Sequence, residues 1–301
     1  MTKFQILLAY WFRASNSKLV KPQPILLEKF RKIIFFLSVL FFKRWITKSQ
    51  STSLQLVDNV DDDLKMQLDI TKKMGAAFFW IGYHEFNEWR YLHRFLKHDM
   101  VFVDVGANQG EYALFAAKRL KKGIVLAFEP VDSFFNQLGI NIKLNGFTNI
   151  RCFNCGLGQT AASMPIYMAK ETQAMAHEGL ATIYPSNDRG HFVQDIQIEV
   201  FDDMDNTLAL NRLDIVKIDV EGAELSVLNG MKNAILKFRP HILIEMNEIT
   251  FNTAGYELNT VLEFFSKLNY TAYSINKKGG LSVVEQISGV VNCVFVPNKI
   301  D

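Results

Sequence analysis

The stretch Val101–Phe115, VFVDVGANQGEYALF, decides the fold of this 301-residue chain. It opens with an apolar run that leads to Asp104, passes through a glycine-rich turn from Gly106 to Gly110, and resumes with apolar residues at helical spacing. This order predicts a buried parallel strand, a tight turn and a helix. Glycine at both ends of the turn lets the backbone bend sharply and approach a ligand closely.

A second apolar run, Ile124–Phe128, is followed by Glu129 and stopped by Pro130. A carboxylate about 20 residues after a glycine turn is placed to accept the ribose hydroxyls of an adenosine-containing ligand. Asp104 and Glu111 flank the turn, and two carboxylates repel a diphosphate but attract an ammonium or a sulfonium group. The turn, GANQG, also departs from G-x-G-x-x-G. These features favour S-adenosylmethionine over NAD.

Four segments, VDVGANQGEY, AFEP, KIDVEGAE and ILIEMNE, resemble in order and spacing the FkbM-type branch of the S-adenosylmethionine-dependent methyltransferases. The resemblance runs from about Trp80 to the C-terminus. It implies an α/β fold with a Rossmann-like, doubly wound, seven-stranded and mostly parallel sheet. It also implies S-adenosyl-L-methionine as cofactor and O-methyl transfer to a hydroxyl of a sugar, glycan or other small natural product. The alternative is a non-catalytic nucleotide-binding or interaction protein that keeps this fold.

The candidate cofactor-binding residues lie in the glycine turn and at the ends of the predicted strands. In the fold that the resemblance implies, the loop after the strand Ile150–Asn154 lies against the adenine. The predicted cofactor-binding residues are Asp104, Gly106, Ala107, Asn108, Gly110, Tyr112, Glu129, Pro130, Asn154, Gly156 and Asp219.

Two further predicted core strands, Leu213–Asp219 and His241–Glu245, each end in an acid. In a doubly wound sheet both strands open onto the crevice at the glycine turn, so Asp219, Glu221 and Glu245 are expected to converge. Asp219 is the first candidate for the base or for orienting the acceptor, although it can instead bind the methionine portion. Asp219 and Glu245, with Asn247, offer hard oxygen ligands, but no spacing fixes a metal site and none is predicted.

Residues 169–193 form a long connection rich in polar residues, which is typical of a lid, a binding loop or disorder. Its plausible chemical residues are His177, Tyr184 and His191, and His177 and His191 are second candidates for the base. Each can equally be an ordinary loop residue. The strand before this connection, Ala162–Met168, is expected at a sheet edge because Pro165 cannot donate to a ladder.

The remaining apolar patterns complete the predicted domain, residues 81–301. They indicate helices at Glu85–Lys97, Val131–Leu144 and Tyr256–Leu268, and strands at Gln194–Phe201, Tyr270–Ile275 and Asn292–Val296. The last strands form the antiparallel edge hairpin that the resemblance implies.

Composition restricts the class of protein. The chain is 49% hydrophobic, which indicates a globular protein, and its formal net charge of +2 argues neither for nor against an anionic partner. Acidic and basic residues are mixed along the predicted domain, whereas a nucleic-acid binder needs a basic face. Cys152, Cys155 and Cys293 are too few for a zinc site and are interpreted as thiols in a reducing compartment. We therefore expect a cytoplasmic protein, with a small-molecule or glycan acceptor as partner and an oligomeric state that the sequence leaves open.

Residues 1–80 lack the Rossmann pattern and are predicted to be a helical extension. Ile33–Phe42 is apolar and flanked by basic residues, too short to span a bilayer and without a signal-peptide cleavage site. It is either a helix that covers the domain or a partner, or an interfacial helix with peripheral membrane contact through residues 29–44. Thr47–Ser53 is interpreted as a linker, and Asp58–Asp63 as a solvated helix start.

Overall fold

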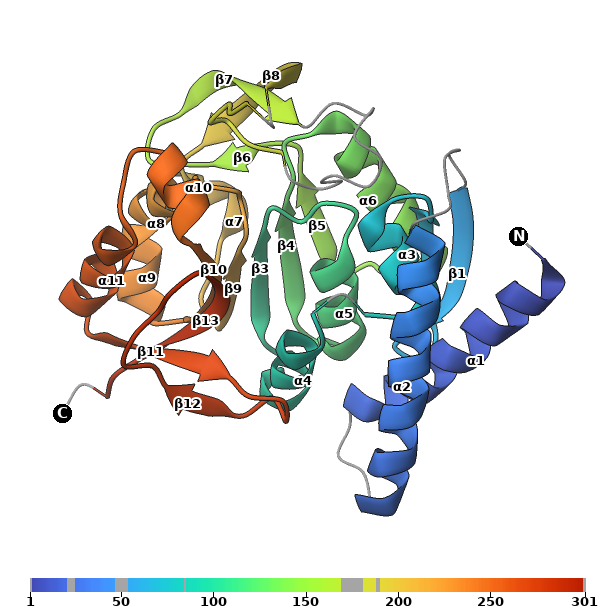
Figure 1. Ribbon diagram of the computed structural model, residues 1–301. Coiled ribbons are helices and arrows are strands. Elements are labelled where there is room, and N and C mark those ends of the chain that lie inside the picture. The colour runs from blue at the N-terminus through green and yellow to red at the C-terminus, as the bar shows by residue number, and fades with distance from the viewer. Residues whose placement is uncertain are drawn as a thin grey trace.

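The structure is a computed structural model that describes residues 2–20, 25–46, 54–83, 85–168, 181–187 and 190–299. A central sheet carries helices on both faces (Figure 1). The strand order is β12-β11-β13-β10-β9-β3-β4-β5. These strands are β3 (Val101–Val105), β4 (Ile124–Phe128), β5 (Ile150–Phe153), β9 (Ile215–Ile218), β10 (His241–Asn247), β11 (Tyr270–Ile275), β12 (Leu281–Val283) and β13 (Val290–Pro297).

The middle of the sheet is parallel, and the edge formed by the last strands is antiparallel. β3 pairs in parallel with β4 and β9, so that Asp104 lies opposite Ala127 on one side and Lys217 on the other. β13 runs antiparallel to both β10 and β11. The predicted doubly wound α/β fold is therefore confirmed. The sheet has eight strands instead of seven because the short strand β12 adds to β11.

Strands buried on both faces explain the continuous apolar runs in the sequence. Phe102 of β3 faces one core, and its neighbours Val101 and Val103 face the other. The first core contains residues of α4 (Phe86–Phe95), α5 (Glu111–Arg119) and α6 (Asp132–Asn145). The second contains residues of α8 (Glu224–Gly230), α9 (Lys232–Phe238), α10 (Glu248–Thr253) and α11 (Leu258–Lys267). Each face of the sheet is thus covered by its own layer of helices.

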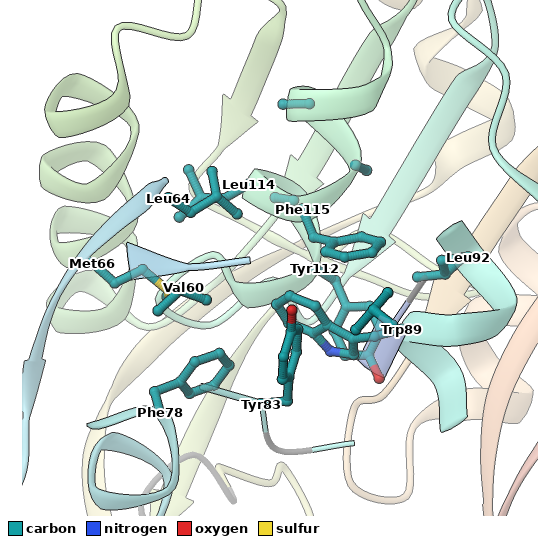
Figure 2. Packing of buried hydrophobic residues seen from close by; sticks show 14 of the residues in the cluster. Val60, Leu64, Met66, Phe78, Tyr83, Trp89, Leu92, Tyr112, Leu114 and Phe115 are labelled. Atoms are coloured by element: carbon teal, nitrogen blue, oxygen red, sulfur yellow. The ribbon is translucent and has the colours of Figure 1, made fainter. Parts of the chain in front are cut away.

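The N-terminal part contains helices and a hairpin. Its elements are α1 (Lys3–Val20), α2 (Ile25–Ile46), β1 (Leu54–Val60), β2 (Leu64–Asp69) and α3 (Lys73–Trp80). β1 and β2 form a separate antiparallel pair, which the prediction of a helical extension did not include. The hairpin and α3 share a core with α4 and α5, where Trp89 lies 4.3 Å from Phe115 and 4.8 Å from Tyr83 between ring centroids (Figure 2).

The prediction of a solvated helix start at Asp58–Asp63 was wrong. These residues end β1 and form the turn of the hairpin, and Asp61 is 1% exposed. The Arg119 guanidinium of α5 donates to both carboxylate oxygens of Asp61, at 2.7 and 3.1 Å. Cations supplied from a distant part of the sequence made burial of an acid possible here, and the local pattern gave no sign of them.

A small second sheet covers the carboxyl end of the large one. It consists of β6 (Gly156–Leu157), β7 (Ala162–Met168) and β8 (His191–Glu199) in the order β6-β8-β7. β7, which contains Pro165, is an edge strand, as predicted. The chain between the two sheets continues through the short helices η1 (Phe201–Met204) and α7 (Asp205–Leu208).

Candidate functional site

A pocket that opens to solvent lies where the carboxyl ends of β3, β4 and β9 meet the small sheet, and its empty space, counted together with the open solvent at its mouth, is about 620 Å³. Its polar wall comes from the large sheet and its apolar wall from β6, β7, β8 and the segment 181–183. The lining residues are Val105, Gly106, Asn108, Glu129, Pro130, Val131, Phe134, Gly156, Leu157, Ile166, Ala181, Ile183, Ile196, Ile198, Asp219, Val220, Glu221 and Ala223.

At the floor of the pocket, the glycine turn that follows β3 lies directly against the backbone of Asp219, just after β9. Gly106 has a φ of +80°, and a Cβ atom built there would lie 2.1 Å from the backbone oxygen of Asp219. No side chain fits in that space. The amides of Gly106 and Ala107 both donate to the Phe128 carbonyl at 3.0 Å, which fixes the turn against β4.

The same turn holds Glu129 in position. The amides of Asn108 and Val131 donate to its two carboxylate oxygens, each at 2.8 Å. Burial raises the pKa of Glu129 to about 7, while these two hydrogen bonds act in the opposite direction. Each oxygen keeps a lone pair for a ligand hydroxyl. Asn108 is one of the residues that line the pocket, and its buried side-chain oxygen has no hydrogen-bond partner within the described part of the chain.

Three carboxylates gather at the ends of β9 and β10. Oxygens of Asp219, Glu221 and Glu245 lie within 4.8 Å of one another, as expected from the topology. Burial, followed by the charges of Asp219 and Glu221, raises the pKa of Glu245 to about 8. The oxygens are close enough to hold a cation, but the Lys217 ammonium already lies 3.1 Å from Asp219. Asn247, the other oxygen donor considered from the sequence, uses its side-chain oxygen to cap α10.

Further charges are buried beneath this cluster. Asp104 is fully buried, and neither of its carboxylate oxygens has a hydrogen-bond partner of normal geometry. Burial raises its pKa to about 6 although Lys217 lies 3.9 Å away. Burial also raises the pKa of Glu111 to about 8. Several acids therefore surround a single ammonium, and this part of the protein favours an added positive charge.

The family model that matches this chain, and two of its relatives, carry the name methyltransferase. The family described as "Methyltransferase FkbM domain" matches residues 104–272, more than half of the chain. The chain belongs to the FkbM methyltransferase family. It is 26% identical over 161 residues to Methyltransferase 1 of Beauveria bassiana, a match covering 49% of this chain and 65% of that protein. It is also 26% identical over 170 residues to Methyltransferase sdnD of Sordaria araneosa, covering 48% and 64% respectively.

Other similarities extend the comparison. The chain is 28% identical over 183 residues to the AMB antimetabolite synthetase AmbE of Pseudomonas aeruginosa, covering 51% of this chain and 9% of that protein. A crystal structure of an FkbM methyltransferase from Methylobacillus flagellatus superposes with a TM-score of 0.43 at 14% identity, over 88% of this chain and 60% of that one. The chain covers slightly less than two thirds of the length of its two fungal relatives. The family assignment confirms S-adenosyl-L-methionine as the predicted cofactor.

The residues of this member of the FkbM methyltransferase family fit that cofactor. Glu129 presents a carboxylate that can take a diol, and Asn108 belongs to the same pocket wall. Apolar side chains around Leu157 and Ile198 form a surface for a flat ring, and Asp219 and Glu221 provide the negative end. The pocket therefore offers a carboxylate that can accept hydrogen bonds from a diol, an apolar wall for an aromatic base, and further carboxylates for cationic groups.

The structure places six of the predicted cofactor-binding residues in the pocket wall and five outside it. The six are Gly106, Asn108, Glu129, Pro130, Gly156 and Asp219. Asp104 lies beneath the turn, Ala107 and Gly110 shape its backbone, and the Tyr112 hydroxyl donates to Glu85. Asn154 donates to the Asp132 side chain at 3.2 Å.

Of the two second candidates for the base, the structure describes only His191, and His191 does not line the pocket. His177 lies outside the described residues. His191 begins β8, is exposed and pairs with Met168 at the end of the small sheet. Tyr184 packs near Gly222, where its ring is 3.2 Å from the position a Cβ would take. The cysteines Cys152, Cys155 and Cys293 are free thiols.

The apolar wall of the pocket was not predicted. Ala181 and Ile183 reach it because the Thr182 hydroxyl donates to the Glu221 carbonyl at 2.8 Å and because Thr182 bridges to Tyr167. The alternation of QDIQIEVF, which puts Ile196 and Ile198 on one side of a strand, was the available signal. That pattern predicts a buried face, but it does not say what the face covers.

Proposed function

We propose that this FkbM methyltransferase transfers a methyl group from S-adenosylmethionine to a hydroxyl oxygen of a small molecule, such as a sugar, a glycan or another natural product. The observation that carries the proposal is the carboxylate cluster Asp219, Glu221 and Glu245 beside a pocket suited to the cofactor. A hydroxyl loses its proton on methylation, and a nearby carboxylate can accept that proton. The name of one relative, an antimetabolite synthetase, also suits a small-molecule acceptor.

In this proposal, different residues of the pocket bind different parts of the cofactor. Glu129 binds the ribose hydroxyls, the apolar side chains near Leu157 and Ile198 contact the adenine, and Glu221 faces the cationic methionine end. When bound, S-adenosylmethionine supplies a methyl group activated by the positive sulfur. The chain itself contributes chiefly by placing the acceptor oxygen in line with that methyl group, which is a matter of positioning.

Glu245 is the base in this proposal, and Asp219 orients the acceptor. Asp219 is held by the ion pair with Lys217, 3.1 Å away, so its carboxylate has a fixed direction. Glu245 lies beside it with a pKa raised to about 8 by burial and by the neighbouring acids. A group with a pKa near the working pH combines a substantial ionised fraction with a useful affinity for the proton. The sequence favoured Asp219 for this role.

The test begins with binding and proceeds to product chemistry. Titration calorimetry with S-adenosylhomocysteine should show binding, and NAD should not bind. Incubation with labelled S-adenosylmethionine and a panel of hydroxyl, carboxyl and amine acceptors should then give a methylated hydroxyl. A methyl ether survives mild alkali whereas a methyl ester does not, so alkali treatment distinguishes methylation of a hydroxyl from methylation of a carboxyl group.

A variant of Glu245 tests the assignment of the base. Glu245→Gln should lower kcat at least tenfold with little change in the affinity for S-adenosylhomocysteine. Turnover should also survive a chelator, because Lys217 already neutralises Asp219. Loss of turnover with a chelator and its return with Mg²⁺ would show that a metal ion assists the reaction, in place of proton transfer to Glu245. Binding of the cofactor without transfer to any member of the panel would favour the non-catalytic alternative.

A further inference from the structure

Exposed apolar side chains are concentrated on the first two helices. Of the 21 large hydrophobic residues that are exposed in the described chain, 13 belong to α1 and α2. Those on α1 are Phe4, Ile6, Leu7, Tyr10 and Trp11, and those on α2 are Leu26, Leu27, Phe30, Ile33, Phe36, Leu37, Leu40 and Phe41. A concentration of exposed apolar side chains on this scale marks an interaction surface. We call these residues the α1–α2 apolar surface.

The opposite side of the same helices is firmly docked on the domain. The Asn16 amide of α1 donates to Ser38 of α2 at 3.2 Å and to the Ile81 carbonyl at 2.9 Å. Phe35 of α2 lies 5.4 Å from Phe86 of α4 between ring centroids. The two helices are therefore positioned by buried contacts, and they project from the body of the protein in Figure 1. The apolar surface is a fixed part of the fold.

Charge separates this segment from the rest of the chain. Residues 1–46 contain nine Lys or Arg residues and one Glu, whereas residues 47–301 contain 24 basic and 30 acidic residues. Three of the basic residues, Lys3, Lys29 and Lys32, are exposed on α1 and α2. A surface that combines exposed aromatic and aliphatic residues with lysines is typical of helices that lie in the interface of a lipid bilayer. Its charge is complementary to acidic headgroups.

We propose that the α1–α2 apolar surface binds the face of an anionic lipid bilayer, with its apolar side chains at headgroup depth and its lysines against acidic headgroups. This inference does not depend on the proposed methyl transfer. No helix in the described part of the chain is long and apolar enough to cross a bilayer, so the helices lie in the interface. A second copy of the chain would bring two strongly basic segments together, and their repulsion disfavours it as the occupant.

Flotation of the full chain tests the proposal. On vesicles of phosphatidylcholine with about one third phosphatidylserine the protein should float, and on pure phosphatidylcholine it should float at least tenfold less. The triple variant Phe30→Glu, Ile33→Glu, Leu37→Glu should stay at the bottom of the gradient. Leu236→Glu, an equally exposed leucine on α9, is the matched control and should float like the wild type. Binding of S-adenosylhomocysteine reports that each variant is folded.

The charge contribution has its own variant. Lys29→Glu with Lys32→Glu should lower the floated fraction at least fivefold and remove most of its salt dependence. The emission of Trp11, which is 49% exposed, should shift to the blue with anionic vesicles, and Trp11→Phe should remove that shift. Flotation of the triple variant like the wild type would overturn the proposal. The proposal would also be overturned if the wild type did not float but formed a dimer in solution and the triple variant were a monomer. The α1–α2 apolar surface would then bind a second copy of the chain.

Discussion

Glu129 shows how a single residue can serve both the fold and a ligand. The amides of Asn108 and Val131 bind it from two sides at 2.8 Å, so the carboxylate is fixed before any ligand arrives. A pre-positioned acceptor loses little conformational entropy on binding. The position of this acid therefore matters as much as its charge.

We predict that Glu129→Gln weakens S-adenosylhomocysteine binding by about 10- to 100-fold, since hydrogen bonds to a charged group contribute roughly 1.5–3 kcal/mol. The amide nitrogen of the glutamine would also face one of the two backbone donors. Calorimetry measures the loss, with Glu263→Gln on the exposed face of α11 as control. Equal affinity of Glu129→Gln and wild type would remove Glu129 from the ribose site.

Lys217 is the second residue on which the site depends. Its buried ammonium lies between Asp219 and Asp104 and 4.7 Å from the centre of the Tyr112 ring. We predict that Lys217→Met lowers the free energy of unfolding by about 3–5 kcal/mol, the usual result of leaving a buried charge without its partner. Denaturant unfolding measures it. Acidification should restore part of the loss because protonation removes the uncompensated carboxylate charge. A Lys217→Met protein as stable as the wild type at neutral pH would contradict this account.

At the scale of elements, the turn between β1 and β2 joins the N-terminal helix α1 to α5, which packs on the large sheet. Asp61 binds Arg119 and Lys118 of α5, while its neighbour Asp62 accepts hydrogen bonds from Ser17 and Lys18 of α1. One acidic turn therefore connects α1 with the helix that follows the glycine turn.

The two acids that contact Lys118 differ in burial and provide a matched pair. We predict that Asp61→Asn destabilises the protein by about 3 kcal/mol, because Arg119 and Lys118 lose a buried partner. Asp63→Asn should cost no more than about 0.5 kcal/mol, because Asp63 is 77% exposed. Thermal unfolding of both variants measures the difference. Equal effects would show that burial does not determine the strength of this ion pair.

The elements that the sequence predicted well are those whose pattern is local. β3, β4 and α5 follow from apolar runs and glycine punctuation, and the acids at the strand ends follow from the topology of a doubly wound sheet. The β1–β2 hairpin was missed because its turn consists of three aspartates, which locally favour a helix start. The ion pair between Arg119 and Asp61, which allows the turn to be buried, is a tertiary contact that the local sequence does not show. The apolar wall of the pocket was missed for the same reason. Its residues reach the site only through tertiary contacts such as that between Thr182 and Glu221.

At the scale of the whole molecule, raised carboxyl pKa values should govern the pH dependence of stability. Burial raises the pKa of six acids to between about 6 and about 8, namely Glu88, Asp104, Glu111, Glu129, Glu224 and Glu245. Because each folded-state pKa lies above the unfolded value, the folded protein binds more protons than the unfolded one in this range. Stability is therefore greatest below about pH 4.5 as far as these groups are concerned, and it is lost as pH rises through their folded values.

We predict that the melting temperature of the ligand-free protein falls by several degrees between about pH 5.5 and about pH 8.5. Scanning fluorimetry across this range measures it. Glu111→Gln, which removes one buried acid without a hydrogen bond on Oε1, should reduce the fall. A cationic ligand should reduce it as well. A melting temperature that rises steadily across the same range would show that these acids do not control stability.

The contact between Gly106 and the backbone of Asp219 has a consequence for synthesis on the ribosome. The glycine turn, β4 and β5 emerge early, but the floor of the pocket is completed only when β9 inserts beside β3 and its Asp219 amide bonds to Val105. A nascent chain that ends before β9 can carry the whole glycine motif and still lack the pocket residues that follow this strand, Asp219, Val220, Glu221 and Ala223. Cofactor capture therefore reports insertion of the central strand, and it can serve as a signal for the moment at which the growing polypeptide completes its sheet.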